Sequence, residues 1–398
     1  IPVSLALFSS EGRALPLQRA GDAPASAAHI ERVYEMTGSV ETWMFEGVPE
    51  RPVPSLLRGF SAPVRLNYPW TRQQLMFLMR HDTDGFNRWD AGQQLAIQAI
   101  HEAQDALASG DSWQPDAALI DTYRHLLEDP DADLALVARM LQLPSESWLI
   151  DLADPADPLR IHSARERVLR TLAEALGDTL MACYDRHYLP DMPYDLKAAA
   201  MARRALCNTV LTWLMAVDHP QGLARAVRQY QGATNLTERA GALRALSLTS
   251  NVTERQAALD DFYNRFQHDP QVIEQWFSIQ ASSPRCGALG QIRQLIAHPA
   301  FDWRNPNKVR AVVGTFANQN LVHFHAIDGA GYAFLADCIQ DLDARNPQVA
   351  ARLATPLTRW KKYDGERREQ MQRALARIQA RPGLSPDVYE VVSKSLLA

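Results

Sequence analysis

The sequence is poor in the features that mark several large classes of protein. It holds four cysteines in 398 residues, and no apolar run approaches the roughly 20 residues that a membrane-spanning helix needs. The first residues carry no charged-then-apolar signal segment. Lysine and arginine number 41 against 46 aspartate and glutamate, and a net charge of −5 leaves no basic excess for binding nucleic acid. These absences predict a cytoplasmic protein with no membrane and no nucleic-acid partner.

The cysteines themselves exclude a disulfide scaffold. They are widely scattered, with no paired spacing of the kind that metal sites or disulfide frameworks show: Cys183, Cys207, Cys286 and Cys338. We therefore expect four buried free thiols, as in a reducing cytoplasm.

The first 70 residues have the pattern of short β-strands. Val3, Leu5 and Leu7 recur with period two, and a turn at residues 9–12 leads to a second extended run at 15–17, which predicts a hairpin. Prolines limit the strands that follow, which we expect at residues 30–36, 41–45, 55–60 and 64–67. This pattern predicts a partial small β-sandwich domain at residues 1–70.

From Thr71 to the end of the chain, apolar residues recur with the helical period. Thr71 is expected to cap the first helix, and the next begins near Asp84. Further helices are expected at residues 116–127, 131–141, 145–152, 158–188 with a break, 195–216, 221–231, 235–247, 253–266, 272–280 and 287–296. Amphipathic helices joined by short connections predict an α-solenoid domain of the armadillo or HEAT type at residues 71–398. The expected fold class is therefore mainly α, a partial β-sandwich followed by an α-solenoid.

Two helix starts stand out near the end of the chain. Asn305-Pro306 and Asn346-Pro347 each place a side-chain acceptor at the N-cap and a proline at the first helical position. They lie about 41 residues apart, within the roughly 40 to 47 residue period of armadillo and HEAT repeats. Between them, the glycines of residues 328–331 indicate a turn, because no strand precedes them and the third glycine of a phosphate-binding loop is absent.

The same stretch carries a family resemblance. Three segments follow one another in the order and spacing of the C-terminal helical domain of the bacterial aminopeptidase N family, the gluzincin-type zinc aminopeptidases: NPNKVR at 305–310, FHAIDGAGYAFL at 324–335 and RNPQVAARL at 345–353. Residues 51–93 resemble the junction between the β-sandwich and the helical domain of these enzymes, and WFSIQASSP at 276–284 also fits. The resemblance covers essentially the whole chain and implies the C-terminal portion of such an enzyme, without its N-terminal and catalytic domains.

The zinc-binding motif of that family is missing. Its members bind zinc with His-Glu-x-x-His and a second glutamate, whereas the one histidine followed by glutamate here, His101, has Asp105 where the second histidine would stand. A helix needs two imidazoles at i and i+4 to hold one zinc, so we expect no catalytic residue, no metal and no activity in this chain alone, and zinc in the intact enzyme. The chain opens at Ile1 on a strand-like segment without an initiator methionine, so we expect the back part of a longer protein.

Three residues are candidates for contact with substrate. Gln348 and Arg352 stand four apart on one expected helix, which puts their Cβ atoms about 5 to 6 Å apart on one face. The resemblance implies that both, together with Arg310, line the inner cavity where the helical domain covers the zinc site. An arginine there can hold a substrate carbonyl, a terminal carboxylate or a carboxylate of the catalytic domain. We therefore predict Arg310, Gln348 and Arg352 as substrate-cavity residues.

A second candidate is His323-Phe324-His325 with nearby Asp328. A His-x-His pair with an acid could bind zinc at the end of a strand, but here helical patterns flank it and no further ligand set is evident. We therefore favour a structural role for both histidines over a metal site, and over an independent hydrolase built on them.

The principal hypothesis follows from the resemblance. The intact enzyme would release N-terminal residues from peptides, and this chain would cap the active-site cavity and gate the access of peptides, with the missing N-terminal and catalytic domains as its partners. The alternative is a stand-alone α-solenoid scaffold that binds another protein on its concave face. If the sandwich lacks preceding strands, residues 3–8 would form an unpaired sheet edge.

Overall fold

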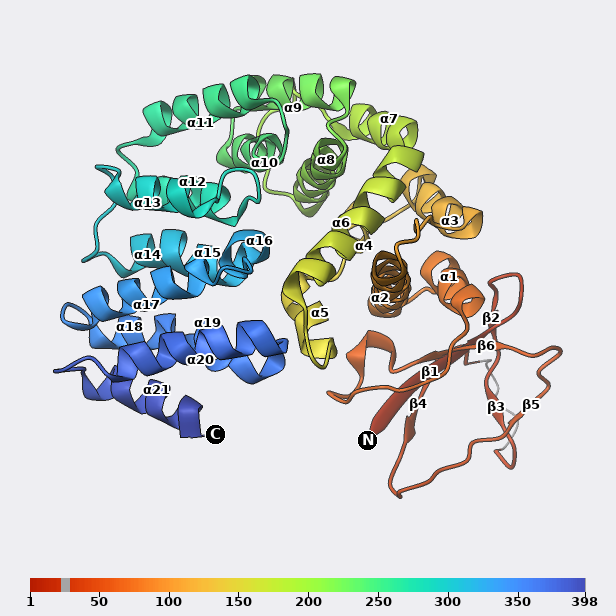
Figure 1. The fold of residues 1–398 in the computed structure, drawn as a ribbon. Helices are drawn as coiled ribbons and strands as arrows, with labels where there is room; N and C mark the ends of the chain where they lie inside the picture. The colour runs from red at the N-terminus through yellow and green to blue at the C-terminus, as the bar shows by residue number, and fades with distance from the viewer. Residues whose placement is uncertain (23–28, 398) are drawn as a thin grey trace. The chain divides into compact units, whose positions relative to one another are not determined.

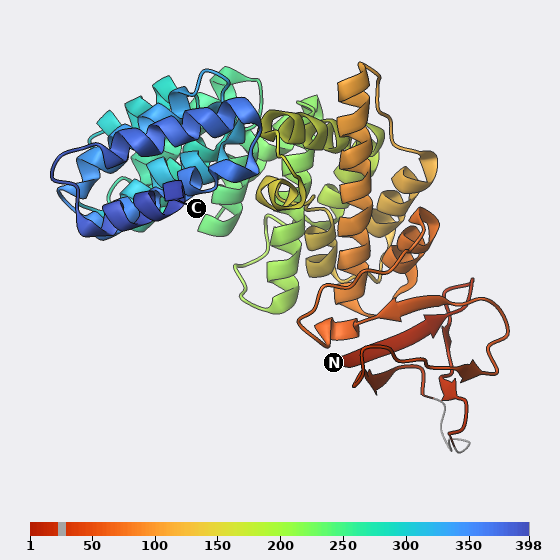
Figure 2. The ribbon, with the colours of Figure 1, turned by 60° about the horizontal axis from the view of Figure 1, so that its bottom comes forward.

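The computed structural model describes residues 1–22 and 29–397. The chain divides into two compact units: unit 1 holds Ile1–Ala99 and Pro115–Leu143, and unit 2 holds Ile100–Gln114 and Pro144–Ala398. Strands occur in the first part of unit 1 and helices in its later part, and helices make up most of unit 2 (Figures 1 and 2). The expected fold class, mainly α after a small β region, is confirmed.

The β region of unit 1 is built around β1 (Pro2–Phe8). This strand pairs antiparallel with β2 (Ala14–Leu15), β4 (Arg32–Glu35) and β6 (Val53–Leu56). Leu7 lies opposite Leu15, which confirms the predicted hairpin. A separate two-stranded sheet contains β3 (Gln18–Arg19) and β5 (Phe45–Glu46). Side chains from both sheets form a small core cluster, made of Leu5, Leu7, Leu17 and Tyr34 with Leu15, Trp43, Phe45, Val48 and Leu56 packed against it.

Several expectations about the strands are wrong. Of residues 41–45 only Phe45 lies in a strand, and residues 58–60 of the expected strand 55–60 form a 3₁₀ turn. Leu5 lies opposite β4 on one side and β6 on the other, so β1 is a central strand rather than an unpaired edge. Where β6 does not reach, the Ser61 hydroxyl accepts a hydrogen bond from the Ser4 amide at 3.0 Å and donates to the Pro2 carbonyl at 3.2 Å. Residues 64–67 form no strand, because a turn at Val64 and flanking prolines leave them without a ladder partner among the described residues.

The helices of unit 1 begin at the capping residues that the sequence offers. Thr71 and Gln74 form a reciprocal capping box at the start of α1 (Arg72–His81). Asp116 and Asp133 accept hydrogen bonds from amides of the first turn in the two helices that end unit 1. The remaining elements are a 3₁₀ turn (Arg58–Phe60), α2 (Gly85–Ser109), which the boundary between the units crosses, α3 (Ala117–Glu128) and α4 (Leu134–Met140).

A buried ion pair joins the end of the β region to the α1–α2 connection inside unit 1. The Arg58 guanidinium lies 2.5 Å from Asp82 Oδ1, and both side chains are almost wholly buried. Arg58 also donates to the hydroxyls of Ser55 at 3.1 Å and Thr83 at 2.8 Å. Burial raises the pKa of Asp82 above its usual value despite the adjacent arginine.

Unit 2 consists of helices joined mainly by short connections, and proline at the first position starts several of them. In the pairs Asp157-Pro158, Asp269-Pro270, Asn305-Pro306 and Asn346-Pro347, the residue before proline accepts hydrogen bonds from first-turn amides. The helices are α5 (Glu146–Leu152), α6 (Pro158–Ala175), α7 (Gly177–His187), α8 (Ala198–Ala216), α9 (Pro220–Gly232), α10 (Leu236–Leu246), α11 (Val252–Phe266), α12 (Pro270–Ser282), α13 (Leu289–Ala297), α14 (Pro306–Val309), a π turn (Arg310–Gly314), α15 (Thr315–Gln319), α16 (Leu321–Phe324), α17 (Ala330–Asp343), α18 (Pro347–Leu353), α19 (Thr355–Thr358), a 3₁₀ turn (Trp360–Lys362), α20 (Gly365–Gln379) and α21 (Pro386–Leu397). The predicted break within 158–188 is confirmed at Leu176.

Neighbouring helices of unit 2 pack on one another as in a solenoid. Helix α10 packs against α8, α9 and α11, and α17 packs against α18 and α20. In Figure 1 the colour passes steadily from green at α9 to blue at α21 along this series. These helices therefore bury their apolar stripes on helices close to them in sequence.

Two distant segments of unit 2 also meet. Ala156, before α6, donates its amide to the Lys362 carbonyl at 2.8 Å and accepts from the Asp364 amide at 3.2 Å. The buried Arg367 forms ion pairs with Asp157 at 3.5 Å and with Asp364. Helix α6 also packs against α16. The early and late helices of the series are thus held together, and we call the segments 151–157 and 359–367 the closure contact.

The buried pair of unit 1 leads to a first prediction. Replacing Arg58→Met leaves Asp82 buried without its cation and should lower the free energy of unfolding by about 3 to 5 kcal/mol at neutral pH. The folded-state pKa of Asp82 lies above its unfolded value, so this carboxyl contributes less stability as pH rises from the unfolded pKa. In acid Asp82 is protonated and needs no cation, so the difference in unfolding free energy between Arg58→Met and the unchanged protein should shrink as pH falls. Urea unfolding at several pH values measures this, with Arg13→Met, which removes an exposed pair with Glu11, as control. Equal effects of the two substitutions would contradict it.

The closure contact leads to a second prediction. Arg367→Met removes the cation that Asp157 and Asp364 share, and should therefore increase local opening of this contact. Hydrogen exchange of the Ala156 and Asp364 amides should accelerate, whereas Arg304→Met, which removes an exposed pair with Asp302, should leave both rates unchanged. Unchanged exchange in both variants would show that the ion pairs do not hold the contact.

Candidate functional site

Arg310 is the first residue of a π-helical turn, Arg310–Gly314, between α14 and α15. The Thr315 amide donates to the Arg310 carbonyl five residues back, and the Thr315 hydroxyl donates to the same oxygen at 3.2 Å. The Arg310 side chain is exposed and donates to Asn307 Oδ1 at 2.9 Å. Turns of this kind occur often at functional sites, since they shift the direction of the side chains around them.

Gln348 and Arg352 lie on the exposed face of α18. Asn346 starts this helix by accepting a hydrogen bond from the Val349 amide at 3.2 Å, as its sequence predicts. The other face, with Ala350 and Leu353, is buried. In residues 1–22 and 29–397, neither Gln348 nor Arg352 has a side-chain hydrogen bond or ion pair, so both are available to a ligand.

The structure brings two of the three predicted residues together. Gln348 and Arg352 share one face of α18, which packs against α17, α19 and α21. Arg310 belongs to a turn that packs against α12, α13, α14 and α15, and no hydrogen bond in the described part of the chain links it to the other two. The assignment of all three to a substrate cavity stays a prediction.

His325 is part of a buried polar network. Its Nδ1 lies 2.8 Å from the Tyr332 hydroxyl, and its backbone carbonyl accepts from Arg367 Nε at 3.0 Å. Burial first, and then the cations of Arg367 and Arg359, lower the pKa of His325 to about 3. The imidazole therefore stays neutral at physiological pH and supports the fold beside the closure contact.

His323 is tied to a different segment. Its Nε2 lies 2.9 Å from the Pro284 carbonyl. The buried Asn320, three residues earlier, donates its amide group to the carbonyls of Ala281, Ser283 and Gly287 at 2.9 to 3.2 Å. The two histidines thus bind different parts of unit 2, and they do not converge on one point as metal ligands would.

The glycine turn before α17 has a steric reason. Gly329 has a φ of +67°, and a Cβ atom on Gly331 would lie 2.2 Å from the Phe324 carbonyl oxygen. Asp328 accepts a hydrogen bond from the Ala330 amide at 3.0 Å. This segment is a turn, as predicted. Its glycines also allow α16 and α17 to approach closely.

Metal and membrane sites are not found in the described residues. In residues 1–22 and 29–397 there is no group of three or more His, Cys, Asp or Glu side chains that could hold a metal ion. Within the same ranges, none of the helices combines the length and apolar character that crossing a bilayer requires.

The cysteines are inert. All four are buried and free, as expected from their spacing. Burial raises the pKa of Cys183 to about 11 and that of Cys338 to about 12. A thiol that is protonated at neutral pH is a poor nucleophile, so the cysteines give no candidate catalytic residue.

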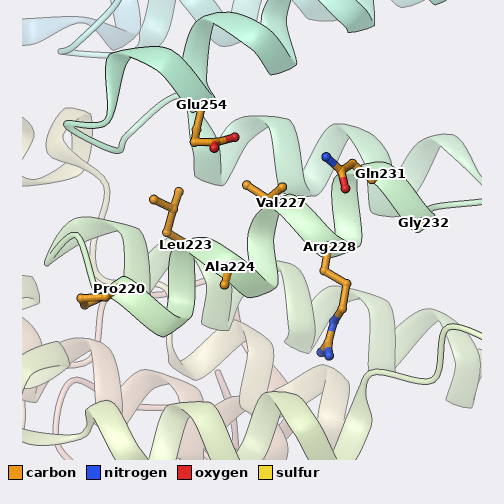
Figure 3. A pocket seen from close by; sticks show the side chains of 8 residues that line it. All are labelled: Pro220, Leu223, Ala224, Val227, Arg228, Gln231, Gly232 and Glu254. Carbon is orange, nitrogen blue, oxygen red and sulfur yellow. The ribbon is translucent and has the colours of Figure 1, made fainter.

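Sequence reasoning did not anticipate an open groove of about 740 Å³ between α9 and the start of α11. Its lining includes Leu223 and Val227 from α9 and Glu254 from α11, and Figure 3 shows Arg228 pointing away from Glu254. Arg228 instead lies over the Tyr188 ring, 5.3 Å from its centroid. One carboxylate beside aliphatic side chains offers neither a nucleophile with its base nor a metal-ligand set, so the groove is no catalytic site.

Comparisons with known proteins find family models that match both parts of the chain. Residues 72–397 match the family model described as "Domain of unknown function (DUF3458_C) ARM repeats", and residues 1–69 match "Domain of unknown function (DUF3458) Ig-like fold". The chain is 37% identical over 396 residues to aminopeptidase N of Escherichia coli. The aligned residues make up 100% of this chain and 44% of that protein. It is 39% identical over 359 residues to aminopeptidase N of Caulobacter vibrioides, covering 89% of this chain and 41% of that protein.

A solved structure gives the same result. The crystal structure of Legionella pneumophila aminopeptidase A in complex with aspartic acid matches with a TM-score of 0.81 and 31% identity, over 100% of this chain and 45% of that one. The chain spans less than half the length of the relatives it matches. It therefore belongs to the DUF3458_C family of ARM-repeat domains, here with the Ig-like DUF3458 domain before it, and is similar along its whole length to part of bacterial aminopeptidase N.

Proposed function

We propose that this chain is the non-catalytic part of a cytoplasmic zinc aminopeptidase of the aminopeptidase N type, and that it caps the active-site cavity and gates the access of peptides. The observation that carries the proposal is similarity to aminopeptidases over the whole chain, at a TM-score of 0.81 for one of them, although the chain covers only 44% or 45% of these proteins. The intact enzyme would release N-terminal amino acids from peptides.

The residues of this chain do not fit a catalytic zinc ion. Such a site needs three protein ligands around an open position. The sequence has no His-Glu-x-x-His motif, and the described residues contain no group of three possible ligands. Zinc and the residues that act with it would therefore belong to the part of the enzyme outside this chain.

The role left for this chain is to shape the path of the substrate. A stack of helices whose early and late members are held together can form a stiff wall that restricts entry and excludes bulk water. On such a wall, the exposed arginine and amide of α18 supply donors for peptide carbonyls or a terminal carboxylate. Arg310 would supply a further guanidinium group. The four buried thiols are compatible with a reducing cytoplasm.

An assay in two parts tests whether catalysis belongs to the part of the enzyme outside this chain. This chain alone, with zinc, should not hydrolyse an alanine or arginine aminoacyl fluorogenic substrate. Activity should appear or rise when the chain is joined to, or mixed with, the remaining part of the same polypeptide. Hydrolysis by the chain alone would contradict the proposal, and so would an intact polypeptide with no aminopeptidase activity.

The role of α18 is tested in the intact enzyme. Arg352→Ala removes a charged donor and should lower kcat/KM for peptides by roughly tenfold or more, mainly through a higher KM. Zinc content and melting temperature should not change, because the Arg352 side chain is exposed and forms no hydrogen bond or ion pair in the described residues. Arg373→Ala, which removes an exposed arginine of α20, is the matched control. Unchanged kinetics in Arg352→Ala would remove this residue from the proposed cavity.

A further inference from the structure

The connection between α7 and α8, together with the first turn of α8, exposes an unusual set of apolar side chains. Five large ones lie within residues 189–201, with exposed fractions of 44% for Leu189, 55% for Met192, 51% for Tyr194, 70% for Leu196 and 54% for Met201. We call them the 189–201 surface. The other exposed large apolar residues of unit 2 are separated along its chain: Leu107, Leu152, Val252, Ile327, Tyr389 and Leu397. Single exposed apolar residues are ordinary, whereas a cluster marks a surface that another molecule covers.

This connection is held in place by a buried arginine. Arg204 of α8 is only 8% exposed, and its guanidinium donates to the Asp195 carbonyl at 2.8 Å. The same group lies 4.8 Å from the centroid of the Tyr194 ring. The Lys197 amide donates to Asp195 Oδ1 at 3.0 Å. The backbone is thus fixed while its apolar side chains face solvent, which lowers the ordering cost of binding.

The composition of the surface suits a protein partner. Leucine, methionine and tyrosine are side chains that fill the centre of protein interfaces, and methionine adapts to irregular partner surfaces. Charged residues of both signs, including Asp191 and Lys197, interrupt the apolar residues along the chain. With Asp195 the segment carries one more negative than positive charge, which does not attract an acidic lipid surface or a nucleic acid.

We propose that the 189–201 surface is the docking surface for the part of the aminopeptidase that lies outside this chain. This inference rests on the proposed function. The relatives extend over the whole of this chain and yet more than half of their length lies outside it. A polypeptide part of that size, tethered to this chain, is the occupant whose presence the comparisons support, and its apolar face would complete the burial of the five side chains.

The test measures side-chain oxidation by hydroxyl radicals, read by mass spectrometry. Oxidation of Met192, Tyr194 and Met201 is compared in this chain alone and in the intact polypeptide with assayed aminopeptidase activity. The rates should fall several-fold in the intact polypeptide. Met44 of unit 1, which is 67% exposed, is the exposed reference, and the fully buried Met371 is the protected one. The fall at Met192 and Met201 should exceed that at Met44.

The outcomes separate this inference from the proposed function. If the intact polypeptide is active and oxidation of the 189–201 surface is unchanged, the docking inference is wrong, whereas the proposed capping function stands. An inactive polypeptide would count against the proposed function itself. Protection that appears in this chain alone and grows with its concentration would instead identify a second copy as the occupant and overturn the inference.

A pair of variants gives a second readout. The double substitution Met192→Ser and Leu196→Ser should weaken binding of this chain to the separately prepared remainder several-fold in titration calorimetry. The double substitution Val252→Ser and Ile327→Ser removes two apolar side chains of similar exposure elsewhere in unit 2. It should leave the binding affinity unchanged. Both chains should keep the same melting temperature, because the replaced side chains are exposed. Equal binding by the two variants would contradict the docking surface.

Discussion

The closure contact is the interaction on which the arrangement of unit 2 depends. Asp151 and Arg359 form an ion pair although 208 residues separate them in the chain. Beside them, Arg367 joins Asp157, Asp364 and the carbonyl of His325 through one buried guanidinium group. A solenoid in which each repeat contacts only its neighbours bends easily, because nothing fixes its two ends. Here the contact links early and late helices of unit 2, and we expect it to limit such bending.

The closure contact also explains why His325 stays neutral. A protonated His325 would place a second cation beside Arg367 in a site with little water, so burial and the arginine together keep the imidazole uncharged. Its Nδ1 and the Tyr332 hydroxyl satisfy each other inside the network. A His-x-His pair that invites a catalytic interpretation in the sequence thus supports the packing of unit 2. Under the proposed function, the exposed side chains of Gln348 and Arg352 would meet the substrate.

The sequence predicted the features that depend on neighbouring residues. Thr71 and Asn346 start helices because the acceptor and the amides it serves lie within one turn. The common face of Gln348 and Arg352 follows from helical periodicity in the same way.

The features that were missed depend on residues far apart in sequence. Besides its hairpin partner, β1 pairs with strands from about 30 and 50 residues further on, so its central place in the sheet could not be recognised from its own pattern. The π turn at Arg310 has no signal in the composition of 310–314, and the apolar residues of 189–201 look in sequence like residues of a core.

The central claim is that this chain restricts which peptides reach a catalytic centre held elsewhere. The most direct measurement is the ratio of kcat/KM for a dipeptide to that for a long unstructured peptide. It should be determined for the intact enzyme and for the catalytic remainder prepared without this chain. The account predicts a higher ratio for the intact enzyme, because the helical wall excludes long substrates more than short ones. Equal ratios in the two preparations would contradict it.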